Sequence, residues 1–243
     1  ELPAESLILL TRLYNRTLRL CHFPQIWKVA VTKAIPKPGK DASLASSYRP
    51  ICLLPIMGKL MEIIIKTRLN VIMDDGNLIP DHQPGFRRNH STIHQVHRVT
   101  NKILTDMDKK RYCPAIFLDV AKAFDKVWHT GLLYKIKELL PDNYYRLLKS
   151  YIENRKFMIK VNDATSSLRD FKAGVPQGSV LGPLLYLFYT RDLPTPRQQG
   201  NMIATFADDT IILTSHVNIT AAILNQQKHL NSTLTWFAKW GIN

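Results

Sequence analysis

Two adjacent acids interrupt an otherwise apolar, β-rich stretch late in the chain. Residues 202–207 and 210–214 are rich in apolar and β-branched side chains, and only Asp208 and Asp209 separate them. Two such runs joined by a short polar pair predict a β-hairpin. A buried carboxylate is costly unless it is paired or bound to a cation, although Asp is also common in solvated turns. The acids therefore belong either to a simple turn or to a site that uses their charge.

A third acid has the same unusual setting far earlier in the chain. Residues 115–120 read Ala-Ile-Phe-Leu-Asp-Val, which predicts a buried strand with Asp119 near its end. Only folding can bring Asp119 beside Asp208 and Asp209. Three carboxylates at strand ends of one sheet form an oxygen-only cage, which suits Mg²⁺. Two such ions can activate an attacking hydroxyl and stabilise a departing pyrophosphate, and they offset charge on a phosphoryl group.

A glycine-containing segment precedes a predicted helix. Residues 174–179 read Gly-Val-Pro-Gln-Gly-Ser, and the helix is expected at residues 180–189. Glycine lets the backbone approach a ligand closely, and a helix that opens after the loop points free N–H groups and a positive dipole end outward. These properties fit packing against a base pair and its phosphates. An ordinary strand-to-helix turn is the alternative.

The charge balance of the chain calls for an anionic partner. The sequence holds 33 Lys and Arg against 19 Asp and Glu, which gives a formal net charge of +14. Nucleic acid and acidic membrane surfaces are the leading candidates, but no run reaches the roughly 18 apolar residues that a membrane span needs. Lys37, Lys40 and Arg49 surround a proline-rich loop and are suited to grip a triphosphate, because Arg binds phosphate bidentately. A solvated basic face is the alternative.

Cysteine usage and the chain ends bear on location and completeness. Cys21, Cys52 and Cys113 are scattered and odd in number, so the sequence predicts no disulfide framework and a reducing compartment. We therefore expect an intracellular protein in the nucleus, the cytoplasm or both. The start of the chain lacks the features of a signal peptide. The missing initiator Met and the abrupt stop at Asn243 predict a fragment of a longer protein.

The spacing of apolar residues predicts a mixture of helices and strands without a regular βαβ repeat, which favours an α+β fold. Helices are expected at residues 3–20, 58–73, 91–107, after His129, and at 142–153, 180–189 and 219–240. Strands are expected at residues 29–35, 115–120, 157–161, 171–174, 202–207 and 210–214. The strand at 29–35 leads into the basic loop.

Six stretches, taken together, span nearly the whole chain. They are Ile35-Pro36-Lys37-Pro38-Gly39-Lys40-Asp41, Ser47-Tyr48-Arg49-Pro50-Ile51, Gly85-Phe86-Arg87 with Ser91-Thr92, residues 118–128 (Leu-Asp-Val-Ala-Lys-Ala-Phe-Asp-Lys-Val-Trp), residues 173–183 and residues 206–209. In this order they resemble the reverse transcriptases of non-LTR (LINE-type) retrotransposons, most closely the Jockey-like group. Any one motif can arise by chance, whereas six in the family's order are highly specific.

The resemblance implies a right-hand polymerase represented by fingers and palm. Residues 1–114 would form the fingers with an N-terminal helical extension, and residues 115–243 the palm, an antiparallel sheet backed by helices. Fingers elements are expected to return at about 129–172. The thumb and the preceding endonuclease of the family are expected on the full-length chain. The implied partners are an RNA template, a DNA primer and dNTPs, with no membrane.

The resemblance also implies the chemistry of individual residues. Asp119, Asp208 and Asp209 match the catalytic acids of the family, and the carbonyl of Val120 would also face the metal. The implied cofactor is a pair of Mg²⁺ ions, for which Mn²⁺ can substitute. Six residues match positions that contact the nucleotide: Lys37, Arg49, Phe124, Gln177, Gly178 and Ala207.

These nucleotide-contacting positions have distinct expected roles. The ring of Phe124 would clash with a ribose 2′-hydroxyl and so favour deoxynucleotides. Gln177 and Gly178 belong to the loop that packs against the template and incoming nucleotide. Ala207 is the small residue beside the nascent pair. The two basic residues of the fingers would touch the incoming triphosphate.

Two other function classes remain open at this point. One is a catalytically inactive nucleic-acid-binding remnant of a decayed element, and the other is an RNA-templated RNA polymerase, against which Phe124 counts. The neighbouring Asp125 is expected to cap the next helix or to pair with Lys122 or Lys126 rather than to ligate metal.

Overall fold

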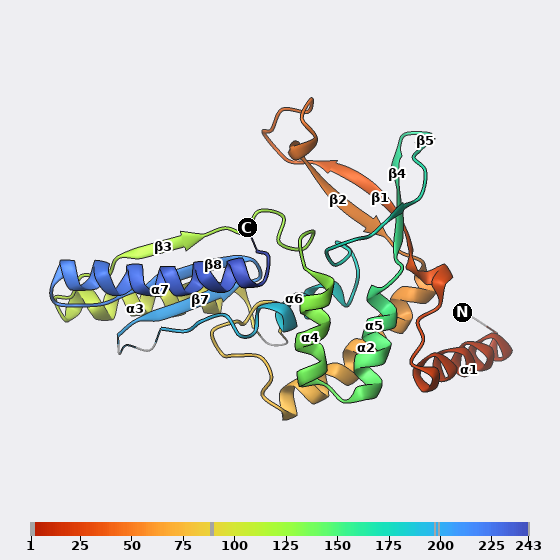
Figure 1. Cartoon of the computed structure of the whole chain (residues 1–243), viewed down its shortest axis with the longest axis horizontal. Helices are drawn as coiled ribbons and strands as arrows, with labels where there is room; N and C mark the ends of the chain where they lie inside the picture. Colours follow the sequence, from red (N-terminus) through yellow and green to blue (C-terminus); the bar gives the residue numbers. More distant parts are fainter. Residues whose placement is uncertain (1–2, 88–89, 197, 199, 243) are drawn as a thin grey trace.

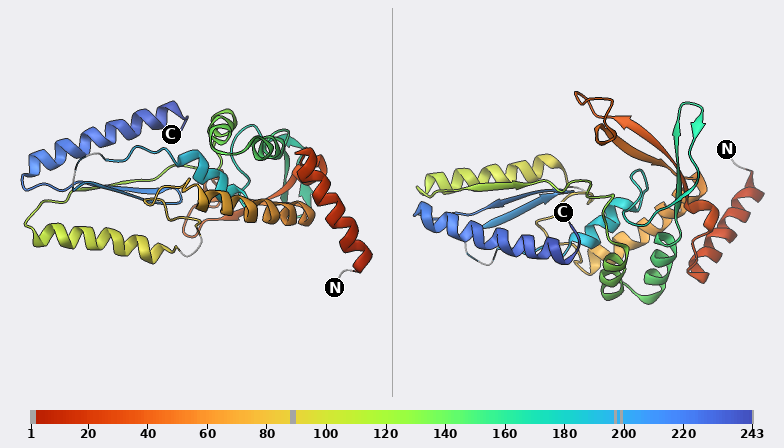
Figure 2. Two further views of the ribbon diagram at one scale, coloured as in Figure 1. Left: turned by 90° about the horizontal axis from the view of Figure 1, so that it is seen from below. Right: turned by 45° about the horizontal axis from the view of Figure 1, so that its top comes forward.

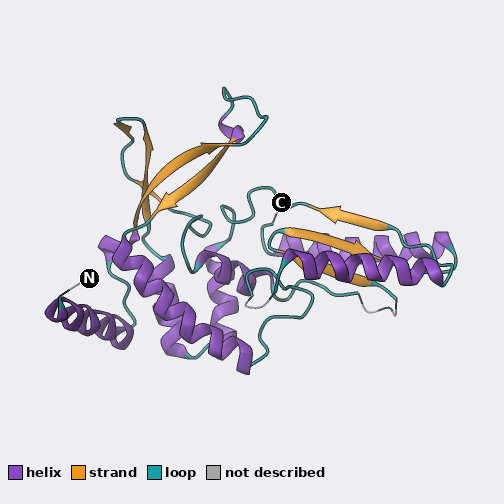
Figure 3. Cartoon of the chain, turned by 180° about the vertical axis from the view of Figure 1, so that it is seen from behind, coloured by secondary structure: helices purple, strands orange, loops and turns teal. Residues whose placement is uncertain are grey.

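Two separate sheets lie at opposite ends of a helical middle (Figure 1). The computed structural model describes residues 3–87, 90–196, 198 and 200–242; Asn243 lies outside them. Within these residues one sheet has five strands and the other has three. Figure 3 shows the same division from behind, with helices between the sheets. The predicted α+β class is therefore confirmed.

The five-stranded sheet is built from two distant parts of the chain. β1 (Val29–Pro36) pairs antiparallel with β2 (Tyr48–Leu53) and parallel with β4 (Lys156–Val161). Two short strands, β5 (Ala164–Thr165) and β6 (Arg169–Asp170), each pair antiparallel with β4. The basic loop therefore joins two strands of a sheet whose other half comes from more than a hundred residues later.

This sheet departs from the sequence prediction in two places. The sequence predicts no strand at β2, which contains Pro50; the proline is tolerated because β2 lies at the edge of the sheet. The strand expected at residues 171–174 is wrong. The Gly174 N–H donates to the Val127 carbonyl and the Val175 N–H to the Phe124 carbonyl, so the backbone here bonds to a loop rather than to a strand.

The three-stranded sheet is antiparallel throughout. β3 (Ala115–Leu118) pairs with β8 (Asp209–Leu213), and β8 pairs in turn with β7 (Met202–Phe206). The strands predicted in these regions are confirmed, with ends that shift by one or two residues. Because β8 is the central strand, it joins the β7–β8 hairpin to β3, which comes much earlier in the sequence.

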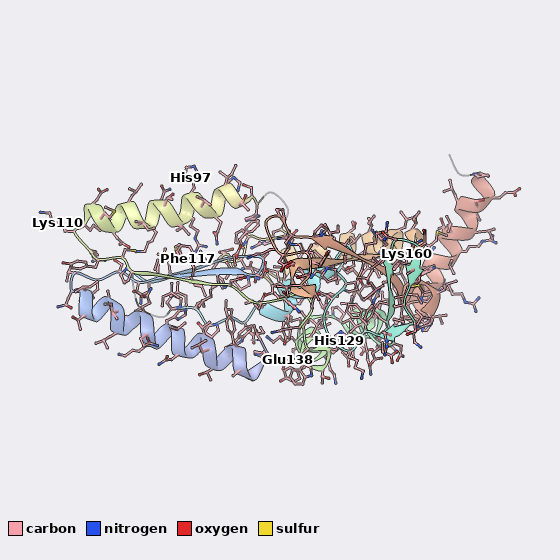
Figure 4. The ribbon with its side chains drawn as sticks, turned by 90° about the horizontal axis from the view of Figure 1, so that it is seen from above. His97, Lys110, Phe117, His129, Glu138 and Lys160 are labelled. Carbon is pink, nitrogen blue, oxygen red and sulfur yellow. The ribbon has the colours of Figure 1, made fainter. Side chains whose placement is uncertain are left out.

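A helix packs on each face of this sheet, as Figures 2 and 4 show. Val99 and Ile103 of α3 (Thr92–Asp108) pack against a buried cluster of Ala204, Ile211 and Leu213 from β7 and β8. On the other face, Trp236 of α7 (Ile219–Lys239) joins the main core. Side chains alternate between the two faces of a strand, so β7 and β8 are buried on both sides and hold their ends in a fixed place.

Four helices form the middle of the molecule. They are α2 (Ile56–Asp75), α4 (His129–Leu139), α5 (Asp142–Ile152) and α6 (Gly182–Thr190). The sequence of α6 is apolar on almost every side, and all its residues except Pro183 are buried. A helix without a polar face must be surrounded by protein. The segment that follows the glycine-containing loop is therefore anchored in the main core.

The N-terminal helix α1 (Ala4–Leu20) lies at the margin of this core. Its Tyr14 ring packs edge-on against Trp27 of the short 3-10 helix η1 (Gln25–Lys28). A second 3-10 turn, η2 (Ala45–Ser47), precedes β2. Each helix predicted from the sequence is present. Among the described residues no helix is both long and apolar enough to cross a membrane, and the three cysteines are free, as predicted.

Candidate functional site

The β7–β8 hairpin presents its acids at the tip. Phe206 pairs with Asp209, so Ala207 and Asp208 are the two tip residues and Asp209 is the first residue of β8. The prediction that Asp208 and Asp209 form the connection between the strands is wrong by one residue. Ala207 has a φ of 59°, and two-residue hairpin turns need positive φ in their first central residue, which explains the shift.

A glycine supports this tip from behind. A Cβ on Gly85 would lie 2.6 Å from the Ala207 backbone nitrogen, closer than real contacts allow. The backbone around Gly85 therefore packs directly against the hairpin. Gln95 of α3 strengthens the same junction, because its Nε2 donates to the carbonyls of His82 and Thr205 at 3.1 and 3.0 Å. Gln95 was not singled out by the sequence, because its role depends on partners more than ten residues away on either side.

The register of β3 and β8 brings the third acid to the same end of the sheet. Leu118 of β3 pairs with Thr210 of β8. The next residues toward the hairpin tip are Asp119, which follows β3, and Asp209, which begins β8. Asp119 and Asp209 are exposed, whereas Asp208 is half-buried. Burial is the main cause that raises the pKa of Asp208, and the charges of Asp209 and Asp119 raise it further. The three predicted acids thus interact electrostatically.

The donor set at this end fits a hard divalent cation. Within the described ranges, no three His, Cys, Asp or Glu side chains are placed closely enough to hold a metal ion by themselves. The three acids nevertheless supply only oxygen donors, which Mg²⁺ prefers, and their mutual repulsion is what a cation would relieve. Val120 and Asp208 line one small pocket, so the backbone that carries the Val120 carbonyl also lies at the acids.

Phe124 stands in a stack of three aromatic rings. Its ring lies 4.8 Å from that of Tyr186 in a stacked geometry, and 5.9 Å from that of Phe86 edge to face. Tyr186 is a residue of α6, and burial raises its pKa, with a further rise from the charge of Asp208. Tyr186 therefore connects Phe124 to the acids. Tyr186 was not predicted to be functional, since an aromatic residue in an apolar helix is usually a core residue.

The loop at residues 174–179 is tied to the segment that contains Phe124. Gln177 Nε2 donates to Asp125 Oδ1 at 2.9 Å, and the Cys52 N–H donates to the Gln177 carbonyl at 2.7 Å. The predicted helix cap at Asp125 is wrong, since α4 begins after Trp128. Of the predicted partners, Lys122 acts on Asp125 through its charge, while the described side-chain hydrogen bond goes to Gln177. Burial is the main cause that raises the pKa of Asp125, while Gln177 and the charge of Lys122 oppose the rise.

Gly178 occupies a position that only glycine can fill. Its φ is 104°, and a Cβ there would lie 2.7 Å from the Cys52 carbonyl oxygen. The loop therefore runs directly along β2. Gln177 is half-buried and Gly178 is exposed, so the part of the loop that reaches solvent is its backbone.

The two predicted basic residues lie apart from the acids, on the five-stranded sheet. Arg49 is exposed on β2, opposite Ile35 of β1. Lys37 follows β1, and its Nζ donates to the Ser46 carbonyl at 3.0 Å. The structure thus gathers Asp119, Val120, Phe124, Ala207, Asp208 and Asp209 in one region, with the Gln177–Gly178 loop attached to it. Lys37 and Arg49 sit on the hairpin of the other sheet.

Solved structures with this architecture identify the class. The structure of an apo telomerase from Candida tropicalis, truncated from its C-terminal domain, matches with a TM-score of 0.61 at 14% sequence identity, over 97% of this chain and 53% of that one. The fold is therefore that of a right-hand polymerase. The chain belongs to the reverse transcriptase (RNA-dependent DNA polymerase) family, whose model matches residues 35–243.

Relatives from retrotransposons are similar over almost the whole chain. The probable RNA-directed DNA polymerase from transposon BS of Drosophila melanogaster is 46% identical over 245 residues, or 98% of this chain. The RNA-directed DNA polymerase from mobile element jockey of Drosophila funebris is 42% identical over 248 residues, or 100% of this chain. The chain spans 27% of the length of each relative. The resemblance to the Jockey-like group is confirmed.

Proposed function

We propose that this chain is the catalytic core of an RNA-directed DNA polymerase, which extends a primer 3′-hydroxyl with deoxynucleotides. The observation that carries the proposal is the convergence of Asp119, Asp208 and Asp209 at one end of the three-stranded sheet. The family match and the names of the relatives support the same activity.

The acids would hold the cofactor together with the carbonyl of Val120. We assign them a pair of Mg²⁺ ions, with Mn²⁺ as a substitute, because every available donor is oxygen. Bound there, divalent ions would supply charge compensation for phosphoryl transfer. The protein's own contribution is to hold these donors at one end of the three-stranded sheet, whose β7 and β8 are buried on both faces, so that little reorganisation is needed during reaction.

The nucleotide would lie between the acids and the basic hairpin. Lys37 and Arg49 would bind the triphosphate, since both are on the hairpin of the five-stranded sheet. Phe124, held in its aromatic stack, would exclude a ribose 2′-hydroxyl. Ala207 has only a methyl group at the hairpin tip and would leave room for the nascent base pair, against which the Gln177–Gly178 backbone would pack.

Template and primer would be held chiefly by their phosphates. The net charge of +14 is suited to an RNA template and a DNA primer, and binding should weaken steeply with salt. We assign residues 1–114 to fingers and 115–243 to palm, with residues 129–172 contributing to the fingers side. The free cysteines are consistent with a reducing compartment, nuclear or cytoplasmic.

Primer extension in the full-length protein tests the proposal. With Mg²⁺, an RNA template and a DNA primer, the wild type should incorporate dNTPs, and Asp208→Ala should lose activity by about 10³-fold or more. Asp163→Ala is the matched control, because Asp163 is an exposed acid beside β5, on the other sheet. Unchanged extension by Asp208→Ala would remove the assignment. Duplex binding without extension by the wild type would indicate a nucleic-acid-binding remnant instead.

A further inference from the structure

A buried acid lies directly behind the loop that contains Gln177 and Gly178. Glu62 belongs to α2, and only 1% of its surface is exposed. Neighbouring α2 residues such as Met61 and Ile65 are core residues, so an apolar side chain would suit this position. Retaining a carboxylate in such a place needs specific partners, because an unpaired buried charge is strongly destabilising.

Those partners are backbone groups at the start of α6. Glu62 Oε2 accepts hydrogen bonds from the N–H groups of Val180 and Leu181, at 2.7 and 3.0 Å. The first N–H groups of a helix have no partner inside the helix. Leu181, which occupies the N-cap position of α6, cannot provide one from its own side chain. Glu62 therefore caps α6 from a helix more than a hundred residues earlier in the chain.

The cap continues into the loop itself. The Ser179 hydroxyl accepts from the Gly182 N–H at 2.9 Å and donates to the Pro176 carbonyl at 2.8 Å. The residues that follow Gly178 are thus fixed by Glu62 and Ser179. Those that precede it are fixed by the contacts to Phe124, Asp125 and Val127 described above. The backbone of Gln177 and Gly178 lies where these two anchored halves meet.

The cost of burying the charge of Glu62 is partly offset inside the protein. Burial raises the pKa of Glu62, whereas the Leu181 N–H and the charge of Arg155 oppose that rise. Arg155 is itself buried, at 3% exposed. A buried acid with a nearby buried base and two backbone donors is a closed arrangement, and it offers Glu62 no route to a bound nucleotide.

We propose that Glu62 is a positioning residue, which sets the place of the Gln177–Gly178 backbone against the incoming nucleotide. This inference rests on the proposed polymerase function. Glu62 acts through the loop, because it contacts the loop's backbone and is closed off from solvent. Loss of the cap should let the loop shift, and a small misplacement of substrate-positioning groups has a large effect on rate.

The test compares three variants in the full-length protein. Glu62→Leu replaces the acid with an apolar side chain of similar size, which removes the hydrogen-bond acceptor. Glu62→Gln keeps an oxygen that can accept both N–H groups. Asp106→Asn is the matched control, since Asp106 is also buried, at 3% exposed, but pairs with Lys102 within α3, away from the loop that contains Gln177 and Gly178. The measurements are kcat and KM for a correct dNTP, the frequency of wrong incorporation, and Kd for the primer–template duplex.

Glu62→Leu should raise the KM for dNTP and the frequency of wrong incorporation by about tenfold, a loss of the size expected for hydrogen bonds to a charged group. Its duplex Kd should stay within about twofold of wild type, and Glu62→Gln should recover most of the loss. Asp106→Asn should leave the KM for dNTP unchanged. A uniform fall in kcat and duplex binding, with the KM for dNTP unaltered, would mean that Glu62 only stabilises the fold and would overturn the inference.

A second variant covers the case in which Glu62→Leu does not fold. Ser179→Ala removes the other anchor of the same half of the loop, and it should raise the KM for dNTP in the same selective way. An unaltered KM would overturn the inference. A wild-type protein that fails to extend any primer would instead refute the proposed function, so the two failures can be told apart.

Discussion

The acidic end of the three-stranded sheet and the basic hairpin of the five-stranded sheet are supported very differently. At the acidic end, β7 and β8 have helices on both faces, and Gly85 packs against the tip at a distance that leaves no space for a methyl group. On the basic hairpin, the second half of β1 is exposed. Gly39, in the loop, has no atom within 4 Å of the place where its Cβ would be.

This difference matches the demands of the two proposed tasks. Groups that stabilise developing charge must be held in place before the reaction, so they belong on buried strands. Groups that grip a flexible triphosphate can adjust to it, so long side chains on an exposed hairpin are sufficient. The comparison predicts that small changes near the acids will have large effects, and that similar changes on the hairpin will have small ones.

Among changes that leave the acids themselves intact, the largest expected effect comes from adding one methyl group behind them. Gly85→Ala should lower kcat for primer extension by about 100-fold, because displacement of the hairpin by a fraction of an ångström misplaces the acids. Gly39→Ala is the matched control: its φ of 69° gives a cost of about 1 kcal/mol in the free energy of unfolding, with extension largely preserved. Steady-state kinetics and thermal unfolding of both variants would check this. Equal losses of kcat would contradict the comparison.

A second expected effect concerns the choice of sugar. Phe124→Ala should raise ribonucleotide incorporation relative to deoxynucleotide incorporation by about tenfold or more, since the removed ring would otherwise meet the 2′-hydroxyl. Phe157→Ala is a matched control. Phe157 lies in β4 of the five-stranded sheet, where its half-buried ring packs edge-on against Phe171. Single-nucleotide incorporation with rNTP and dNTP would measure the ratio. If both variants keep the wild-type ratio, the gate lies elsewhere.

The sequence predicts features that depend on neighbouring residues and misses those that depend on distant ones. The hairpin of 202–214 follows from two local runs of apolar and β-branched residues, and its acids stand out because their neighbours are apolar. The position of the turn was wrong by one residue, because it depends on the positive φ of Ala207 and on contact with Gly85. No local pattern indicates that Glu62, in an ordinary amphipathic helix, caps α6.

The same distinction explains the errors around Asp125 and residues 171–174. Lys122 and Lys126 are the nearest opposite charges in sequence, and local reasoning selects them as partners of Asp125. The charge of Lys122 does act on Asp125, but the hydrogen bond comes from Gln177, whose amide donates to Asp125, and Asp125 caps no helix. Residues 171–174 have the composition of a strand, but the Phe171 N–H donates to the Arg155 carbonyl just before β4, and the Gly174 N–H donates to the Val127 carbonyl. In both cases a loop-to-loop contact, which has no periodicity, replaces the expected local structure.

The smallest expected effect is on the basic hairpin, and it tests whether Arg49 contacts the triphosphate. Arg49→Ala should raise the KM for dNTP by only about fivefold, because an exposed cation is screened by water and salt. The effect should shrink as salt is raised, since screening already weakens the wild-type contact. Arg169→Ala removes the same charge from β6, at another exposed place on this sheet, and should leave the KM for dNTP unchanged.

If both variants raise that KM equally, the hairpin contributes only to the general positive field, and the assignment of Arg49 to the triphosphate is wrong. If Arg49→Ala instead lowers kcat as severely as Gly85→Ala, the basic hairpin is as finely positioned as the acids, and the contrast between the two regions does not hold.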